Sequence, residues 1–367
     1  MTLAMVLCAG GSLLIGIAPT HESIGVGAAI LLVVARCVQG LAHGGETGAA
    51  YTYLAEMAPP RRRGLWSSTM YVAVTAGTLS ATLLGAVLTS TVPHSMMVSW
   101  AWRVPFVIGA ILGLYALWLR RSLDETPVFD RTDADIPASA EKMNEQTATE
   151  ATSLLAGVWR HRLAVLRVIG ITVGGTVFYY TWAVSAPTYA IGVKGIDPSA
   201  ALWAGVAANI VFLVVLPLWG ALSDRWGRRT NGLIFACGAI VLSFPLTVLI
   251  QNEAWQLGVA MSVALVVMAS VSAIGPAWFA ELFPTSVRAS GLGIPYSIAV
   301  ALTGGTAPYL QAWLADRNQE YLFTAYVVVL AAISLFTVLC TRETRGISLA
   351  CSHIHREDQP CPTNSVR

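Results

Sequence analysis

The sequence predicts an all-α membrane protein of ten transmembrane helices in two helical bundles, and three observations lead to this fold class. Only 11% of the 367 residues are charged, against about 25% in a typical soluble domain, and the mean hydropathy is +0.64. The charges are clustered, so long charge-free runs remain between them. Finally, motifs in the first part of the chain return in the second part, which predicts two related bundles.

Runs without Asp, Glu, Lys or Arg mark the individual helices, because a helix needs about 20 apolar residues to cross a bilayer. These runs predict spans within 1–21, 65–90, 104–119, 168–193, 198–223, 230–252, 254–280, 289–315 and 321–341. The region 23–55 is equally apolar, with only Arg36 and Glu46 as charged residues, and it predicts one more helix.

A hydrophilic stretch divides these helices into four and six. It predicts an N-terminal bundle at 1–121, a cytoplasmic linker at 122–163, a C-terminal bundle at 164–342 and a disordered cytoplasmic tail at 343–367.

Basic residues predict the orientation. The segments 61–63, 120–167, 225–229, 288 and 342–367 hold 18 Lys and Arg residues, whereas the opposite loops hold three, Arg103, Lys194 and Arg317. Since cytoplasmic loops carry the excess of basic residues, the rich side is cytoplasmic. We therefore expect a multi-pass plasma-membrane protein with both termini in the cytoplasm.

Two pairs of motifs indicate an internal repeat. "LAEMAPPRRRG" at 54–64 matches "FAELFPTSVRA" at 279–289, so that Glu56 aligns with Glu281 and Arg63 with Arg288 at an offset of 225. A second echo joins "DETP" at 124–127 to "RETR" at 342–345, at an offset of 218. Each pair occupies matching positions in the two bundles, which argues for duplicated halves.

The repeat also predicts what the first half lacks. "GALSDRWGRR" at 220–229 follows two helices of the second half, and its first-half counterpart would precede Met1. The expected architecture is therefore 6 + 6 helices, of which this chain carries 4 + 6. A misassigned start codon and a natural truncation both account for this.

Several motifs resemble those of the major facilitator superfamily, over essentially the whole chain. "GALSDRWGRR" resembles the cytoplasmic loop signature, and "RCVQG" at 36–40 resembles the arginine–glutamine motif of the fourth family helix. "GGE" at 44–46, "LAEMAPPRRRG", "WAWRVPF" at 100–106 and "RRSLDETPVF" at 120–129 resemble the metabolite:proton symporter branch, which includes α-ketoglutarate, shikimate, citrate and proline/betaine carriers. The resemblance implies the major facilitator fold and transport of a small metabolite.

A polar stripe lies within the predicted helix 23–55. Arg36, Gln39, His43 and Glu46 are spaced 3, 4 and 3 residues apart, which places them on one helix face about 15 Å long. Charged residues at membrane depth usually face a cavity or a partner. In one interpretation the stripe lines a substrate and proton path, with Arg36 binding a carboxylate and Glu46 carrying the proton; in the other, both residues form structural pairs between helices. Gly40, Gly44, Gly45 and Gly48 on this helix predict close helix packing.

The second half offers further path candidates. Tyr179 and Tyr180 lie within the first helix of that half, and Asn209 is a polar side chain deep in the next one. These side chains can donate hydrogen bonds to an anion in a mostly apolar pocket, although aromatic residues in membrane helices also serve in core packing. Tyr296 and Gln311 are weaker candidates.

The family resemblance implies a cytoplasmic gate near "GALSDRWGRR". Asp224 and Arg228 resemble gate residues that pair differently as two bundles rock, with Glu281, Arg288, Glu56 and Arg63 as partners from the repeated loops. The full set of gate candidates is Asp224, Arg225, Gly227, Arg228, Arg229, Glu56, Arg63, Glu281 and Arg288. Arginines at this position also anchor a helix end on the cytoplasmic side.

These features favour a secondary active transporter that couples protons to the import of a small polar metabolite, an organic acid above all. The chain carries no nucleotide-binding signature and no catalytic grouping, so we expect neither an enzyme nor a cofactor or metal. The expected partners are substrate, protons and the lipid bilayer, without nucleic acid, and we expect a monomer. An exporter, a uniporter and a non-transporting truncated fragment are the alternatives.

Overall fold

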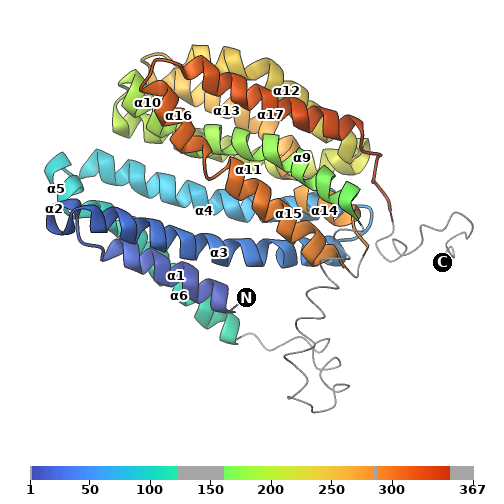
Figure 1. Cartoon of the computed structure of the whole chain (residues 1–367), viewed down its shortest axis with the longest axis horizontal. Coiled ribbons are helices and arrows are strands. Elements are labelled where there is room, and N and C mark those ends of the chain that lie inside the picture. Colours follow the sequence, from blue (N-terminus) through green and yellow to red (C-terminus); the bar gives the residue numbers. More distant parts are fainter. Residues whose placement is uncertain (1, 123–160, 285–286, 348–367) are drawn as a thin grey trace, which may run out of the picture. The chain divides into compact units, whose positions relative to one another are not determined.

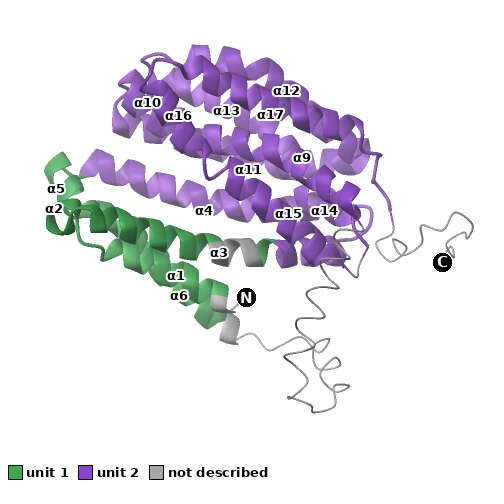
Figure 2. Ribbon diagram, viewed as in Figure 1, with its two compact units in different colours: residues 1–47, 92–160 green, residues 48–91, 161–367 purple. Residues whose placement is uncertain are grey.

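A computed structural model describes residues 2–122, 161–284 and 287–347, and within these ranges every regular element is a helix (Figure 1). The predicted all-α fold class is therefore confirmed for the described chain. The chain divides into two compact units, drawn in green and purple in Figure 2: unit 1 comprises 1–47 and 92–160, and unit 2 comprises 48–91 and 161–367. Residues 123–160 of the predicted linker and 348–367 of the predicted tail lie outside the described residues. The predicted bundle boundaries stay a proposal.

Unit 1 is a small group of helices built around α1 and α6. Its elements are α1 (Thr2–Gly16), α2 (His21–Ile24), the first part of α3 (Val26–Met57), α5 (His94–Ser99), η1 (Ala101–Arg103) and α6 (Val104–Ser122). A Cβ atom added to Gly113 of α6 would lie 2.9 Å from the Cβ of Ala9, so the small residues permit a close approach to α1. The Arg103 guanidinium donates to the carbonyl of Ala18 at 3.1 Å. This bond joins the segment after α1 to the segment before α6.

Unit 2 contains the remaining helices and a continuous apolar core. Its elements are the end of α3, α4 (Arg63–Thr91), α9 (Arg162–Tyr179), the π-helical segment η3 (Tyr180–Ser185), α10 (Ala186–Lys194), α11 (Pro198–Trp226), α12 (Arg228–Leu249), α13 (Ala254–Ser272), α14 (Gly275–Glu281), α15 (Arg288–Thr303), α16 (Ala307–Ala315) and α17 (Glu320–Leu339). Helix α4 packs against α11, and both α9 and α12 pack against α17. Phe178, Phe212, Phe235 and Trp278 are fully buried in the core.

Seven helices among the described residues are long and apolar enough to cross a membrane. Shorter apolar helices at Ala4–Gly16 and Val26–Gly40 occupy the predicted spans 1–21 and 23–55, and α15 with α16 occupies 289–315. The molecule is thus a multi-pass membrane protein, while the count of ten crossings stays a prediction.

Three predicted spans change their helical geometry part of the way along, and each change is followed by a proline. Helices α10, α14 and α16 all carry a proline in their first two positions, namely Pro187, Pro276 and Pro308. Proline cannot donate the backbone hydrogen bond that would continue the preceding helix, but it fits the first turn of a new one. The charge-free runs could not reveal these changes because they report composition only.

Candidate functional site

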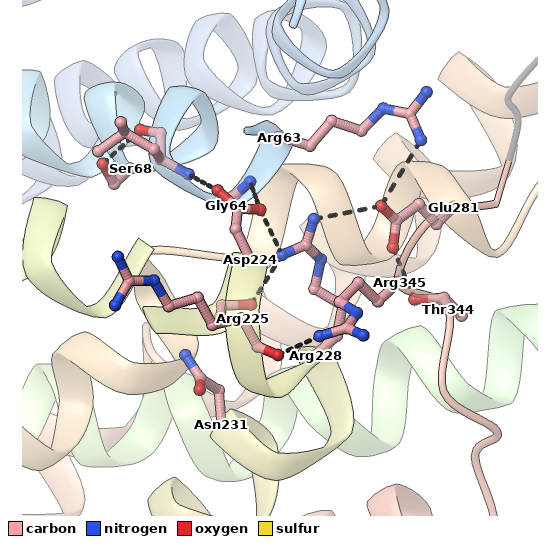
Figure 3. A network of polar contacts seen from close by, with 12 residues as sticks. Arg63, Gly64, Ser68, Asp224, Arg225, Arg228, Asn231, Glu281, Thr344 and Arg345 are labelled. Carbon is pink, nitrogen blue, oxygen red and sulfur yellow. Dashed lines mark hydrogen bonds and ion pairs between the residues drawn. The ribbon is translucent and has the colours of Figure 1, made fainter. Parts of the chain in front are cut away.

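Seven charged side chains of unit 2 lie where its helices begin or end, and we call this set the charged layer; Figure 3 shows four of them, Arg63, Asp224, Arg228 and Glu281. Its members belong to the ends of α3, α4, α11, α12, α14 and α15 and to the segment after α17. They are Glu56, Arg63, Asp224, Arg228, Glu281, Arg288 and Glu343.

Asp224 binds the first turn of α4. Its carboxylate accepts hydrogen bonds from the backbone N–H groups of Gly64 at 2.8 Å and Leu65 at 3.0 Å (Figure 3). An anion at a helix N-terminus satisfies free N–H groups and meets the positive end of the helix dipole. The backbones approach closely here, since a Cβ atom on Gly64 would lie 2.5 Å from the carbonyl oxygen of Gly220. Asp224 therefore joins α11 to α4 through backbone groups, and the close approach requires glycine at position 64.

Gly227 alone separates α11 from α12. The charge-free run 198–223 places Asp224 and Arg225 beyond the helix, but α11 continues to Trp226, so both residues lie in its last turn. The turn requires glycine, because its φ is 99° and a Cβ atom would collide with the Glu343 carboxylate. Gly227, one of the gate candidates, thus forms the turn between the two helices.

Glu343 closes the N-terminus of α12. Its carboxylate accepts hydrogen bonds from the backbone N–H groups of Arg228 at 2.8 Å and Arg229 at 3.0 Å. Sequence reasoning missed this role because residue 343 falls at the start of the predicted disordered tail. The available signal was the "DETP" and "RETR" echo, which marked Glu343 and Thr344 as part of the repeat.

Arg228 links two acidic members of the layer, Asp224 and Glu281. It is 1% exposed; its Nη1 donates to Asp224 Oδ1 at 2.9 Å, and its Nη2 lies 3.6 Å from Glu281 Oε1. Glu281 is also buried, and its Oε2 accepts a hydrogen bond from the Thr344 hydroxyl at 2.6 Å. Buried charges are tolerated only when paired, so these groups depend on one another.

Arg225 and Arg229 make different contacts. The Arg225 side chain is exposed, and its backbone carbonyl accepts from the Arg345 guanidinium. The Arg229 Nη2 donates to the carbonyl of Leu339 at 3.0 Å, at the end of α17. Both contacts hold helix ends together.

The charged layer pairs each repeated loop with the other one. Arg288 Nη1 donates to Glu56 Oε1 at 2.6 Å, and Arg63 Nη1 lies 3.9 Å from Glu281 Oε1. Because Glu56 corresponds to Glu281 and Arg63 to Arg288, the two cross pairs are equivalent under the repeat. The helices agree with this relation, since α4 begins at Arg63 and α15 begins at Arg288.

The aromatic path candidates of unit 2 lie at the junction of α9 and η3. The Tyr179 and Tyr180 rings meet edge to face at 5.9 Å between centroids. Tyr180 packs against the segment between α15 and α16, where a Cβ atom on Gly304 would lie 2.6 Å from its ring. Asn209 is buried on α11 and donates to the carbonyl of Gly205 at 2.9 Å, so one of its donors serves its own helix.

The polar stripe of α3 lies in unit 1. Arg36 is exposed; its Nη1 donates to Gln39 Oε1 at 3.3 Å, and its guanidinium lies 5.8 Å from the Phe106 ring centre. Gln39 in turn donates to the Ser12 hydroxyl at 2.9 Å, which fixes the amide. Glu46 is partly buried on the same helix, whereas the His43 side chain lies outside the described residues.

Three tyrosines form a further cluster, of which the sequence had singled out only Tyr296. The hydroxyl oxygens of Tyr51, Tyr71 and Tyr296 lie 3.2 Å from one another. Tyr51 comes from α3, Tyr71 from α4 and Tyr296 from α15. The offset of 225 between Tyr71 and Tyr296 was the missed signal, because it is the offset of the repeat.

Comparison with known proteins gives a consistent set of matches. A family model described as "Sugar (and other) transporter" matches residues 1–353. The alpha-ketoglutarate permease of Escherichia coli (strain K12) is 35% identical over 353 residues, which are 95% of this chain and 78% of the permease. The proline/betaine transporter of the same strain is 29% identical over 362 residues, covering 96% of this chain and 72% of that protein.

Solved structures of low sequence identity share the fold. The xylose transporter XylE from E. coli, in a partially occluded inward open conformation, aligns with a TM-score of 0.70 at 18% identity, covering 95% of this chain and 81% of XylE. The major facilitator superfamily transporter FucP, in an outward conformation, aligns with a TM-score of 0.60 at 15% identity, covering 92% of this chain and 81% of FucP.

Proposed function

The chain belongs to the sugar (and other) transporter family of the major facilitator superfamily, and from this premise we propose that it imports a small organic acid together with protons. The chain is a membrane transporter and not an enzyme; the direction, the proton coupling and the substrate class are the proposal. The proposed orientation places the charged layer on the cytoplasmic side, where the basic segments lie.

The observation that carries the substrate class is Arg36. A guanidinium in an apolar span is costly, and it is retained where it serves a ligand or a partner. Its contacts with Gln39 and Phe106 orient it without an ion pair to any carboxylate among the described residues. Arginine presents donors that fit a carboxylate in a bidentate manner. The relative with 35% identity is named as a permease of alpha-ketoglutarate, a molecule with two carboxylates, and this supports the same class.

The charged layer supplies a mechanism for alternating access. Its pairs join the loop 54–64 of one half to the loop 279–289 of the other, and Asp224 joins α11 to α4. We propose that these contacts close the cytoplasmic end of the path and separate when the halves rock. Arg228 then keeps Asp224 as a partner, since both groups belong to the same half.

Uptake measurements on reconstituted protein test the substrate class. Proteoliposomes receive labelled α-ketoglutarate, with proline and betaine as competitors. Arg36→Ala should lower α-ketoglutarate uptake roughly 10- to 100-fold, because hydrogen bonds to charged groups contribute about 1.5–3 kcal/mol each. Arg317→Ala is the control, since Arg317 is an exposed arginine whose guanidinium contacts Trp313, four residues earlier in the chain. Normal uptake by Arg36→Ala would contradict carboxylate binding at this residue.

The same vesicles test coupling. An imposed proton gradient, acid outside, should drive α-ketoglutarate above its equilibrium level, and a protonophore should abolish the accumulation. Uptake that only equilibrates and ignores the protonophore would instead indicate a uniporter. Proton-driven extrusion would indicate an exporter.

A further inference from the structure

The three-tyrosine cluster is built so that its hydroxyl groups satisfy one another. Each of the three O···O distances among Tyr51, Tyr71 and Tyr296 is 3.2 Å, so the hydroxyls form a closed triangle. Three hydroxyls carry three donors and enough lone pairs to accept them in a cyclic arrangement. At 3.2 Å these hydrogen bonds are longer than the usual O–H···O distance, so each is weak and readily broken.

The rings beneath these hydroxyls fill the space between the three helices. Tyr51 is 2% exposed, and its ring lies 5.4 Å from that of Tyr296 between centroids. The Phe279 ring of α14 lies 6.1 Å from the Tyr296 ring between centroids. The cluster therefore combines packed aromatic rings with three hydroxyl groups, one each from α3, α4 and α15.

The position of Tyr71 and Tyr296 follows from the repeat. They are 225 residues apart, the same offset that relates Glu56 to Glu281 and Arg63 to Arg288. Two equivalent residues of related halves can touch only close to the axis that relates the halves. In the major facilitator fold this axis runs along the membrane normal, and the substrate site lies at the interface of the halves. The contact between Tyr71 and Tyr296 therefore lies on the line along which substrate moves.

The cluster is separate from the charged layer. Tyr71 follows Arg63 by eight residues on α4, and Tyr296 follows Arg288 by eight residues on α15, a rise of about 12 Å. Farther along α4, the Thr78 side chain lies near that of Tyr179. The order along the helices is thus charged layer, tyrosine cluster, then the aromatic path candidates.

We propose that Tyr51, Tyr71 and Tyr296 form a second closing layer of the transport path, between the charged layer and the substrate. The proposal rests on the proposed function. When the halves separate, the hydroxyl triangle breaks between the first-half pair, Tyr51 and Tyr71, and Tyr296 of the second half. The weak hydrogen bonds set the balance between closed and open forms. The charged layer closes the cytoplasmic end of the path.

A cysteine reporter tests this layer without requiring transport. Thr78→Cys, in a background without the six native cysteines, places a thiol beyond the cluster as seen from the charged layer. Its reaction with an impermeant maleimide is followed from each face of oriented vesicles. Arg62→Cys, at an exposed residue beside the charged layer, identifies the corresponding face. Tyr71→Phe combined with Tyr296→Phe removes two hydroxyls and keeps both rings.

The double tyrosine variant should raise labelling of the Thr78→Cys reporter from the charged-layer face roughly 3- to 10-fold and lower it from the opposite face, because lost hydrogen bonds favour the open form. Tyr309→Phe, at a tyrosine that is 72% exposed, should change neither rate. A cluster that only stabilises the core would lower protein yield without shifting the ratio between faces, and that result would overturn the proposal. If the rates shift while the parent protein takes up no substrate, the closing layer stands and the proposed function fails.

Discussion

At the scale of single residues, Glu46 provides the test of proton coupling, because its carboxyl is the proposed proton carrier on the polar stripe. It follows Arg36 by ten residues on α3, about 15 Å away along the helix. Glu46→Gln should abolish proton-driven accumulation in proteoliposomes, while exchange of labelled for unlabelled substrate, which moves no net proton, should continue.

Glu22 provides the matched control for this substitution. It is an exposed glutamate in α2 of the same unit, and Glu22→Gln should leave accumulation unchanged. If Glu46 serves instead as a structural partner of a basic group, Glu46→Gln should lower folding yield together with both accumulation and exchange. Normal accumulation by the Gln variant would contradict the coupling role.

At the scale of elements, the crossing of α3 and α15 depends on two glycines. A Cβ atom on Gly48 would lie 2.7 Å from the carbonyl oxygen of Ala289 and 2.9 Å from the Cα of Gly293. Gly48→Ala should therefore destabilise the closed protein by about 1–3 kcal/mol, the usual range for overpacking, and lower the thermal midpoint in detergent. Of the glycines expected to allow close packing on this helix, Gly48 does so, whereas Gly40 has no neighbour within 4 Å of its Cβ position.

Gly77→Ala is the control for this prediction. Gly77 lies within α4 with no atom within 4 Å of its Cβ position, so alanine adds helix propensity without a collision. Its thermal midpoint should stay the same or rise, since glycine in a helix interior costs roughly 0.5–1 kcal/mol relative to alanine. Equal thermal midpoints for Gly48→Ala and Gly77→Ala would show that α3 and α15 can move apart without loss of stability.

For the whole molecule, the repeat creates two equivalent cross pairs whose surroundings differ. The Glu281 side chain is fully buried beside Arg63 and Arg228, whereas the Glu56 side chain is 41% exposed beside Arg288. Glu281→Gln should reduce stability by about 3–5 kcal/mol, because the buried Arg63 loses its carboxylate and the buried Arg228 keeps only Asp224. Glu56→Gln, its repeat equivalent, should reduce it by at most about 1 kcal/mol, because solvent screens that pair.

Denaturation of the two glutamine variants side by side measures this asymmetry. Each variant is the control for the other, since the chemical change is identical and the positions are related by the repeat. Similar losses from Glu56→Gln and Glu281→Gln would show that burial does not distinguish the two pairs.

Much of the molecule could be predicted from the sequence. Charge-free runs, read with the thickness of a bilayer, established an all-helical membrane protein, because an apolar backbone in lipid must satisfy its own hydrogen bonds. The offset of 225 identified Glu56, Arg63, Glu281 and Arg288 as corresponding residues. Glycine at 227 indicated the turn between α11 and α12 because the requirement for a positive φ is local.

Only the tertiary structure decided which groups meet. Arg288 pairs with Glu56 across the halves, Glu343 closes α12 from more than 100 residues away, and Tyr51 joins Tyr71 and Tyr296. It also showed that Asn209 donates to its own helix. Periodicity and motif spacing report which face of a helix a residue occupies, but partners depend on how distant helices pack. Packing is settled by the shapes of many side chains at once, and no single stretch of sequence contains that information.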